Sequence, residues 1–124
     1  MDRENEAYTV YEDKEFVAFL DINPVTRGHT LVIPKEHIRW PDEVPNFGAY
    51  FEAARKIGNA LKKVFAANPV YYQTMGFGIS HAHLHVIPRY PDDGHGEVLD
   101  WDKIQELSKE EMAAIAAKLR KALK

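Results

Sequence analysis

Three histidines occupy every second position of an otherwise apolar run, residues 79–88. An alternation of period two is typical of a β-strand, because successive side chains of a strand point to opposite faces of the sheet. The pattern predicts a strand over 79–87 that carries His81, His83 and His85 on one face and apolar side chains on the other. One face of this strand would therefore present the reactive imidazoles, and the other would pack in the protein core.

Four further strands are predicted from short runs of β-branched and aromatic residues that end at turn residues. The first two, 8–11 and 16–20, are joined by the polar turn 12–14 and are predicted to form a hairpin. The third, 29–33, stops at Pro34, which has no N–H to donate to a sheet ladder. The fourth, 70–74, is separated from the histidine strand by a turn containing Gly76 and Gly78, which favours an antiparallel pair.

Two amphipathic helices are predicted. The first covers 47–65, where apolar residues recur at helical spacing, with Asn46 as N-cap and Asn68-Pro69 as the stop. The second begins at the capping box Ser108 to Glu111 and continues with apolar residues 112, 115, 119 and 123. The order of elements predicts an α+β fold, a five-stranded antiparallel sheet with two main helices, in one domain over residues 1–124.

Charge and composition exclude several classes of protein. The formal net charge of −3 gives no general attraction to nucleic acid or to an anionic membrane. The absence of cysteine excludes disulfides, thiolate zinc sites and cysteine nucleophiles, and it fits a cytoplasmic protein. Residues 1–6 are too charged for a signal peptide, and no run of about 18 apolar residues predicts a membrane span. No phosphate loop or dinucleotide glycine fingerprint is present, so any nucleotide site must be built differently.

The histidine run admits three interpretations. The rings could be half-buried structural residues, although three titratable rings on one face are more typical of a functional site. Two of them could bind a metal ion, but one ion cannot easily bind all three, because His81 and His85 would lie about 13 Å apart along a strand. Alternatively, the middle ring, His83, could attack phosphorus while the flanking rings donate to the phosphoryl oxygens. Such an attack needs one bare ring nitrogen, with the other nitrogen donating to a fixed acceptor.

Two separated blocks of the sequence resemble the histidine-triad family. Residues 81–87 match the pattern His-φ-His-φ-His-φ-φ, in which φ is apolar, at every position. Residues 11–13, 18–24 and 28–38 resemble the N-terminal half of the same family. The resemblance implies a five-stranded α+β domain, commonly a homodimer, that needs no cofactor and binds a nucleoside phosphate, with a purine as the expected base. It also implies transfer or hydrolysis of a nucleotidyl group.

The resemblance also implies roles for individual residues. His83 would be the nucleophile that carries a covalent nucleotidyl intermediate, His85 would contact the phosphate, and His81 would orient or polarise the site. Asp21 would bind the ribose hydroxyls, Ile22 would lie beside the base, and His29 would support the triad. The transferase branch for hexose phosphates has glutamine where this chain has His85, so water is the expected acceptor. The expected reaction is hydrolysis of a nucleoside phosphoramidate, a dinucleoside polyphosphate or an adenylylated small molecule.

The sequence departs from the family just before the triad, where Gly76-Phe77-Gly78 replaces the usual Gly-Gln-Ser or Gly-Gln-Thr. We expect backbone N–H groups of the turn Gly76 to Gly78 to replace the missing hydroxyl as anion donors. The same departure motivates an alternative, a nucleotide sensor with weakened catalysis. A histidine-based metal site is a third alternative, although we expect no metal.

Other residues have simpler interpretations. Asp21 could start a turn rather than bind ribose. His37 and His95 are expected to be solvated loop residues in the segments around them, the latter in the polar loop 92–102. Arg89 fits a phosphate contact or a surface cation equally well. The two tryptophans, Trp40 and Trp101, are expected in packing or at a dimer interface.

Overall fold

The computed structural model describes residues 8–124, in which five strands form one sheet of order β1-β2-β3-β5-β4 with every neighbouring pair antiparallel. The strands are β1 Thr9–Glu12, β2 Phe16–Leu20, β3 Thr30–Pro34, β4 Val70–Gln73 and β5 Leu84–Pro88. The helices are α1 Phe47–Phe65 and α2 Lys109–Ala122, and a short 3₁₀ turn, η2, covers Pro41–Glu43. The predicted α+β class with a five-stranded antiparallel sheet and two main helices is confirmed. The predicted domain range starts at residue 1, and its residues 1–7 lie outside the described part of the chain.

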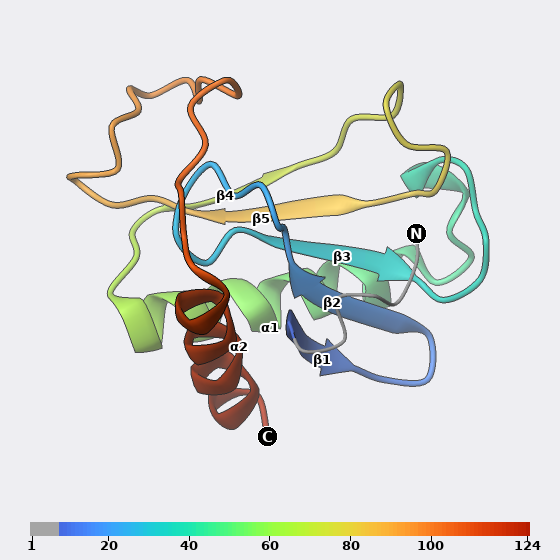
Figure 1. Ribbon diagram of the computed structural model, residues 1–124. Helices are drawn as coiled ribbons and strands as arrows, with labels where there is room; N and C mark the ends of the chain where they lie inside the picture. The colour runs from blue at the N-terminus through green and yellow to red at the C-terminus, as the bar shows by residue number, and fades with distance from the viewer. Residues whose placement is uncertain (1–7) are drawn as a thin grey trace.

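Both helices lie on the same side of the sheet, and the segment between β5 and α2 passes over the other side (Figure 1). On the helix side, apolar side chains of the central strands pack against α1, with Val32, Leu84 and Val86 against Ile57 and Leu61, all at most 1% exposed. Neither helix of residues 8–124 has the length and apolar composition that crossing a membrane requires.

A second, smaller cluster lies on the opposite face of the sheet. Ile87 of β5 packs there with Val25 and Leu99, and Tyr71 and Trp101 flank them. Alternation along the strands assigns His85 of β5 to this face, because it lies two residues from Ile87. The loop side of the sheet therefore holds the candidate residue His85, and the helix side holds the main core.

Local hydrogen bonds confirm the predicted hairpin and the predicted start of the second helix. In the β1–β2 turn, Asp13 Oδ1 accepts the backbone N–H groups of Glu15 and Phe16, each at 2.8 Å. At α2 both halves of the capping box form, since Ser108 Oγ accepts the N–H of Glu111 and a Glu111 carboxylate oxygen accepts the N–H of Ser108, each at 3.0 Å. These bonds satisfy donors that a helix leaves unpaired at its first turn.

The first helix differs from its prediction in two details. Asn46 is the N-cap residue, but its side chain donates to Glu15 at 3.1 Å instead of capping the helix. Phe47 and Phe51, which the helical stripe placed toward the core, are 47% and 39% exposed. The buried face of α1 is formed by other residues, Tyr50, Ala53, Ala54, Ile57, Gly58, Ala60 and Leu61.

The predicted strand over 79–87 is wrong in its first half, because β5 begins at Leu84. Leu84 pairs with Val32 of β3, so continuing the ladder by two residues would set Ala82 opposite Pro34. Proline has no N–H for that ladder. The N–H of Ala82 donates instead to the carbonyl oxygen of Ile38 at 2.6 Å. His81 and His83 consequently lie on irregular backbone that leads into the strand.

Gly28 fixes the entry to β3, directly before His29. Its φ of +97° lies in the left-handed region, which side chains other than glycine strain to adopt. A Cβ at this position would also lie 2.9 Å from Leu61 Cδ2 of α1. Glycine therefore allows the chain to turn closely over the helix and to present the next residue to the loop side of the sheet.

Candidate active site

His83 and His85 bring two buried imidazoles together at the start of β5. Their ring centroids are 5.0 Å apart in an edge-to-face arrangement, and the residues are 4% and 5% exposed. His85 is held in the ladder between Leu31 of β3 and Gln73 of β4. The backbone of His83 is fixed by Thr74, whose hydroxyl donates to the His83 carbonyl oxygen at 2.8 Å.

The hydrogen bonds of His83 define which ring nitrogen is bare. Nδ1 of His83 lies 3.1 Å from the carbonyl oxygen of His81. A carbonyl oxygen can only accept, so Nδ1 carries the proton. In the neutral ring Nε2 is then unprotonated and carries a lone pair. This is the arrangement that the sequence analysis required of a nucleophilic imidazole.

A chain of hydrogen bonds defines the tautomers of His29 and His85 in the same way. Nδ1 of His29 accepts the backbone N–H of Val25 at 3.2 Å, so the proton of the neutral ring is on Nε2. Nε2 of His29 lies 2.9 Å from Nδ1 of His85 and donates to it. The proton of the neutral His85 ring is therefore also on Nε2. His85 is thus a hydrogen-bond donor through Nε2, in contrast to His83.

Burial keeps both of these rings neutral. Desolvation, with a smaller contribution from His85, lowers the pKa of His29 from 6.5 to about 3. Desolvation and the neighbouring His83 lower the pKa of His85 from 6.5 to about 4. At neutral pH both rings are therefore uncharged, which the single proton in their shared hydrogen bond requires.

The ring of His81 is tied to a different part of the structure. Its Nε2–H donates to the carbonyl oxygen of Pro34 at 2.9 Å, and the ring lies edge-on to His37 at a centroid distance of 5.1 Å. Burial is the main cause that lowers its pKa. The ring contacts of the described residues join His83, His85 and His29 into one cluster, and His81 enters that cluster through its carbonyl oxygen.

Asp21 lies at the end of β2, beside this cluster. Its Oδ1 accepts the N–H of Asn23 at 2.8 Å, so the residue does start a turn, as its simpler interpretation proposed. Its Oδ2 lies 3.6 Å from Nε2 of His29. Burial is the largest influence on its pKa, which is raised. Ile22, next in the chain, is 56% exposed and offers apolar surface beside the carboxylate.

The turn that precedes the triad is built around Trp40 and Arg39. A side chain on Gly76 would collide with the Trp40 ring, and Arg39 Nη1 donates to the carbonyl oxygens of Gly76 and Ile79 at 2.7 and 2.8 Å. A Cβ added to Gly78 would have no other atom within 4 Å. Phe77 between them is 96% exposed. The carbonyl groups of this turn are therefore held by the 39–40 segment. That the N–H groups of Gly76 to Gly78 donate to an anion stays a prediction.

Asp21, His29 and His85 form one arrangement that resembles a metal site, since a donor atom of each lies within 4.8 Å of the others. The tautomers argue against an ion there. Nδ1 of His29 accepts from Val25, so Nε2 could bind a metal only if the ring lost both protons or gave up the Val25 bond. A structural zinc ligand instead donates its second nitrogen to an acceptor. The residues therefore do not fit a resident metal ion.

Three residues near the site make contacts that the sequence analysis did not identify. Trp101 lies edge-on to both His29 and His85, at centroid distances of 5.8 and 5.0 Å. Arg89 is 8% exposed and pairs with Asp93 at 2.8 Å, so it is neither a surface cation nor free to contact a phosphate. His95 is half-buried and bonded through both ring nitrogens, which corrects the expectation of a solvated residue. Trp101 and His95 make contacts with distant segments across the loop side of the sheet, whereas Arg89 pairs within its own loop.

Comparison with known protein families and structures agrees with this geometry. The family model of the HIT domain matches residues 2–92. The chain belongs to the HIT family. This HIT protein is 40% identical over 128 residues to an uncharacterized HIT-like protein from Borreliella burgdorferi, with 87% of this chain and 88% of the relative covered. It is 32% identical over 116 residues to adenosine 5'-monophosphoramidase from Schizosaccharomyces pombe, with 87% and 82% covered.

Among solved structures, the HIT protein resembles the crystal structure of a zinc-bound histidine triad family protein from Mycobacterium smegmatis. The two superimpose with a TM-score of 0.74 at 32% identity, covering 94% of this chain and 83% of that one. The family resemblance expected from the two sequence blocks is thereby confirmed, and so is the fold that it implied.

Proposed function

We propose that this HIT protein is a nucleotidyl hydrolase that cleaves a nucleoside phosphoramidate, a dinucleoside polyphosphate or an adenylylated small molecule. One observation carries the proposal. His83 donates its Nδ1 proton to the His81 carbonyl oxygen and keeps a lone pair on Nε2, in a buried ring beside a second imidazole that donates. A neutral imidazole with a fixed orientation is a competent nucleophile toward phosphorus.

The reaction then proceeds in two displacements. Nε2 of His83 forms a bond to phosphorus while the bond from phosphorus to the leaving group breaks, which gives a nucleotidyl-histidine, and the leaving group takes up a proton. Water next attacks the same phosphorus and gives up a proton, the bond to Nε2 breaks, and a nucleoside monophosphate is released, so that the net reaction consumes one water. His85 Nε2–H, whose direction of donation is fixed by His29, supplies a hydrogen bond to a phosphoryl oxygen as negative charge builds up.

The nucleoside would bind at the end of β2. We propose that Asp21 Oδ2 accepts the ribose hydroxyls, because Oδ1 is already engaged by Asn23. Ile22, 56% exposed, would cover one face of the base. The N–H groups of Gly76 and Gly78 would donate to phosphate oxygens, since the carbonyl side of their turn is held by Arg39. A purine is the proposed base, a choice supported by the adenosine substrate in the name of the fission-yeast relative.

Turnover assays on purified protein test the proposal. The panel contains adenosine 5'-phosphoramidate, a diadenosine polyphosphate and adenylyl-lysine, with release of AMP as the signal. Hydrolysis of at least one compound, lost in His83→Asn, is the expected result. Binding of AMP without hydrolysis of any compound would overturn the proposal in favour of the nucleotide-sensor alternative.

We also propose that the protein is a homodimer that pairs through α1 and β4. Strand β4 is an edge of the sheet, and an apolar surface beside it exposes Trp40, Phe47, Phe51, Tyr72 and Met75, each 36–47% exposed. Such a patch next to a sheet edge is typical of a protein–protein interface. Sedimentation of the wild type as a dimer and of Phe51→Asp as a monomer supports the proposal, whereas a monomeric wild type overturns it.

A further inference from the structure

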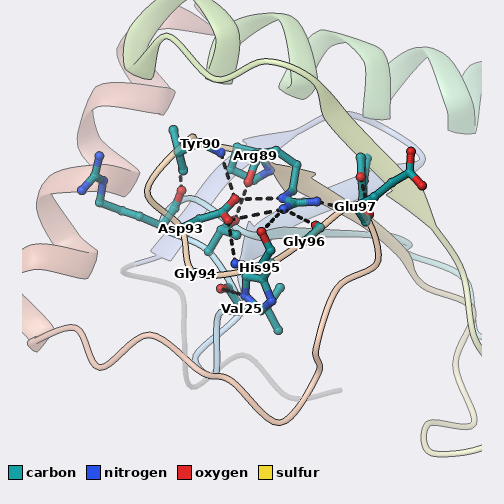
Figure 2. Close-up of polar contacts among 12 residues, drawn as sticks. Val25, Arg89, Tyr90, Asp93, Gly94, His95, Gly96 and Glu97 are labelled. Atoms are coloured by element: carbon teal, nitrogen blue, oxygen red, sulfur yellow. Dashed lines mark hydrogen bonds and ion pairs between the residues drawn. The ribbon is translucent and has the colours of Figure 1, made fainter.

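The segment that follows β5 is locked by a buried ion pair, although it forms neither helix nor strand. Arg89 Nε donates to Asp93 Oδ2 at 2.8 Å, and Arg89 Nη2 lies 3.3 Å from Asp93 Oδ1. The carboxylate also accepts the N–H groups of Tyr90 and His95, at 2.9 and 3.0 Å (Figure 2). Both charged residues are 8% exposed. A buried charge pair with its remaining positions filled by hydrogen bonds holds its backbone tightly.

The same guanidinium fixes the backbone that follows the His95 side chain. Arg89 Nη2 donates to the carbonyl oxygens of His95 and Gly96, at 3.2 and 2.7 Å. The Arg89 guanidinium also lies 4.8 Å from the centre of the Tyr71 ring. Figure 2 shows these bonds converging on Arg89, with the His95 ring below them pointing toward Val25. The loop therefore presents one imidazole in a defined position.

The His95 ring uses both of its nitrogens. Nδ1 accepts the backbone N–H of Asp100 at 3.1 Å, so the proton of the neutral ring is on Nε2. Nε2 donates that proton to the carbonyl oxygen of Val25 at 2.8 Å, across 70 positions of sequence. His95 thus connects the loop over the sheet to the segment that leads into β3.

Val25 connects His95 to the active site through its two backbone hydrogen bonds. The residue is 1% exposed, its carbonyl oxygen is held by His95, and its N–H donates to Nδ1 of His29. His29 in turn donates to His85. One continuous series of hydrogen bonds therefore runs from the Asp100 N–H through two histidines to the ring that faces the phosphate in the proposed function.

We infer that His95 is a positioning residue of the nucleotidyl site, which acts through Val25 and His29 to hold His85 in the tautomer with its proton on Nε2. The inference rests on the proposed function for its effect on catalysis. Either nitrogen of a neutral imidazole can carry the proton, and the partner of the other nitrogen selects which one does. Without the bond from His95, the Val25 backbone holds its N–H less firmly against His29. His85 would then divide between a donating and an accepting Nε2.

Two variants at this position separate the hydrogen bond from the volume of the ring. His95→Phe keeps a ring but removes both hydrogen bonds, and His95→Gln keeps an amide N–H that can reach the Val25 carbonyl oxygen. Lys103→Ala is the matched control, because Lys103 ties the same loop by donating to the Gly94 carbonyl oxygen at 3.1 Å without contacting Val25. Each variant is assayed with adenosine 5'-phosphoramidate, and its histidine tautomers are measured by long-range proton–nitrogen NMR.

His95→Phe is expected to lower kcat by about tenfold or more, the usual range for loss of a residue that orients a site through another. KM should change much less, because His95 lies outside the nucleoside pocket of the proposal. NMR should show His85 protonated on Nε2 in the wild type and in a mixture of tautomers in His95→Phe. His95→Gln should recover much of kcat, and Lys103→Ala should match the wild type.

An unchanged kcat and an unchanged His85 tautomer in His95→Phe would overturn the inference. If His95→Phe does not fold, an equal loss in His95→Gln and Lys103→Ala would overturn it, because a general loosening of the loop would then explain both. If the wild type hydrolyses no nucleotide, the proposed function fails, while the NMR comparison still tests the role of His95 alone.

Discussion

The carbonyl oxygen of His81 accepts the Nδ1 proton of His83 at 3.1 Å, so the backbone of the first histidine sets the tautomer of the second. That carbonyl is itself positioned, because the next N–H, of Ala82, donates to Ile38. The irregular backbone before β5 is therefore what leaves Nε2 of His83 bare. In a regular strand this carbonyl would point toward a neighbouring strand and could not serve the ring.

Replacing the proposed nucleophile should abolish turnover while leaving binding intact. We predict that His83→Asn lowers kcat on the order of 10³-fold or more, because no other group supplies the lone pair. The variant leaves the proposed nucleoside contacts of Asp21 and Ile22 in place, so the Kd for AMP measured by calorimetry should stay within a few-fold. In His83→Gly, added imidazole should restore part of the activity, and retained activity in His83→Asn without imidazole would remove His83 as the nucleophile.

Stability should fall as the pH is lowered from about 6.5 to 4. The pKa values of His29 and His85 are lowered to about 3 and about 4 in the folded protein, so the unfolded chain binds these two protons first. The free energy of unfolding therefore decreases on acidification, by up to about 1.4 kcal/mol per pH unit for each ring. Urea titrations at several pH values in this range give the free energy of unfolding as a function of pH. Its dependence on pH should be weaker in His29→Gln, by the contribution of one ring. Equal slopes for the two proteins would show that His29 is protonated in the folded state.

Adding a methyl group at Gly28 should destabilise the fold, and adding one at Gly48 should not. Gly28 has φ +97° and would place its Cβ 2.9 Å from Leu61, whereas a Cβ on Gly48 in α1 meets no atom within 4 Å. We predict that Gly28→Ala lowers the free energy of unfolding by about 1–3 kcal/mol and reduces activity, because His29 follows directly. Gly48→Ala should be neutral or more stable by up to about 1 kcal/mol. Thermal and urea unfolding compare the two, and similar stabilities would contradict the strained conformation at Gly28.

Removal of metal ions should leave activity unchanged. Nδ1 of His29 accepts the N–H of Val25 and Nε2 carries the proton, so the His29 ring offers no free lone pair to an ion in the cluster with Asp21 and His85. Dialysis against a chelator followed by the adenosine 5'-phosphoramidate assay measures this. Loss of activity that zinc restores, together with stoichiometric zinc in the untreated protein, would show that the His29 ring releases Val25 to bind a metal.

Local patterns predicted the fold well, because strands, helices and the capping box at Ser108 each depend on neighbouring residues. The start of β5 was misplaced because Pro34, which ends the ladder, is 50 positions from Leu84 in the chain. Phe47 and Phe51 follow the same helical stripe as the core residues, and only the packed structure shows that they face outward. Helical periodicity alone does not distinguish burial in the core from a surface that another molecule covers.

The site was predicted in part. The proximity of His83 and His85 follows from the spacing of the run, but their tautomers depend on carbonyl and N–H groups outside the strand that the pattern predicts. His95 was misjudged because its partner Val25 lies 70 positions away in the chain. The role of Arg89 was left open, because its partners in the same loop include backbone carbonyl oxygens that a sequence pattern does not mark. Contacts of a side chain with distant backbone leave no periodic trace in sequence.

The most direct test of the account is mass spectrometry of the wild-type protein quenched in alkali during turnover of adenosine 5'-phosphoramidate. Alkali is required because the phosphorus–nitrogen bond of a nucleotidyl-histidine is labile in acid. We predict an added adenylyl mass on the peptide that contains His83, located on that residue by fragmentation and absent from His83→Asn. Turnover with no adduct, or with an adduct on another residue, would contradict it.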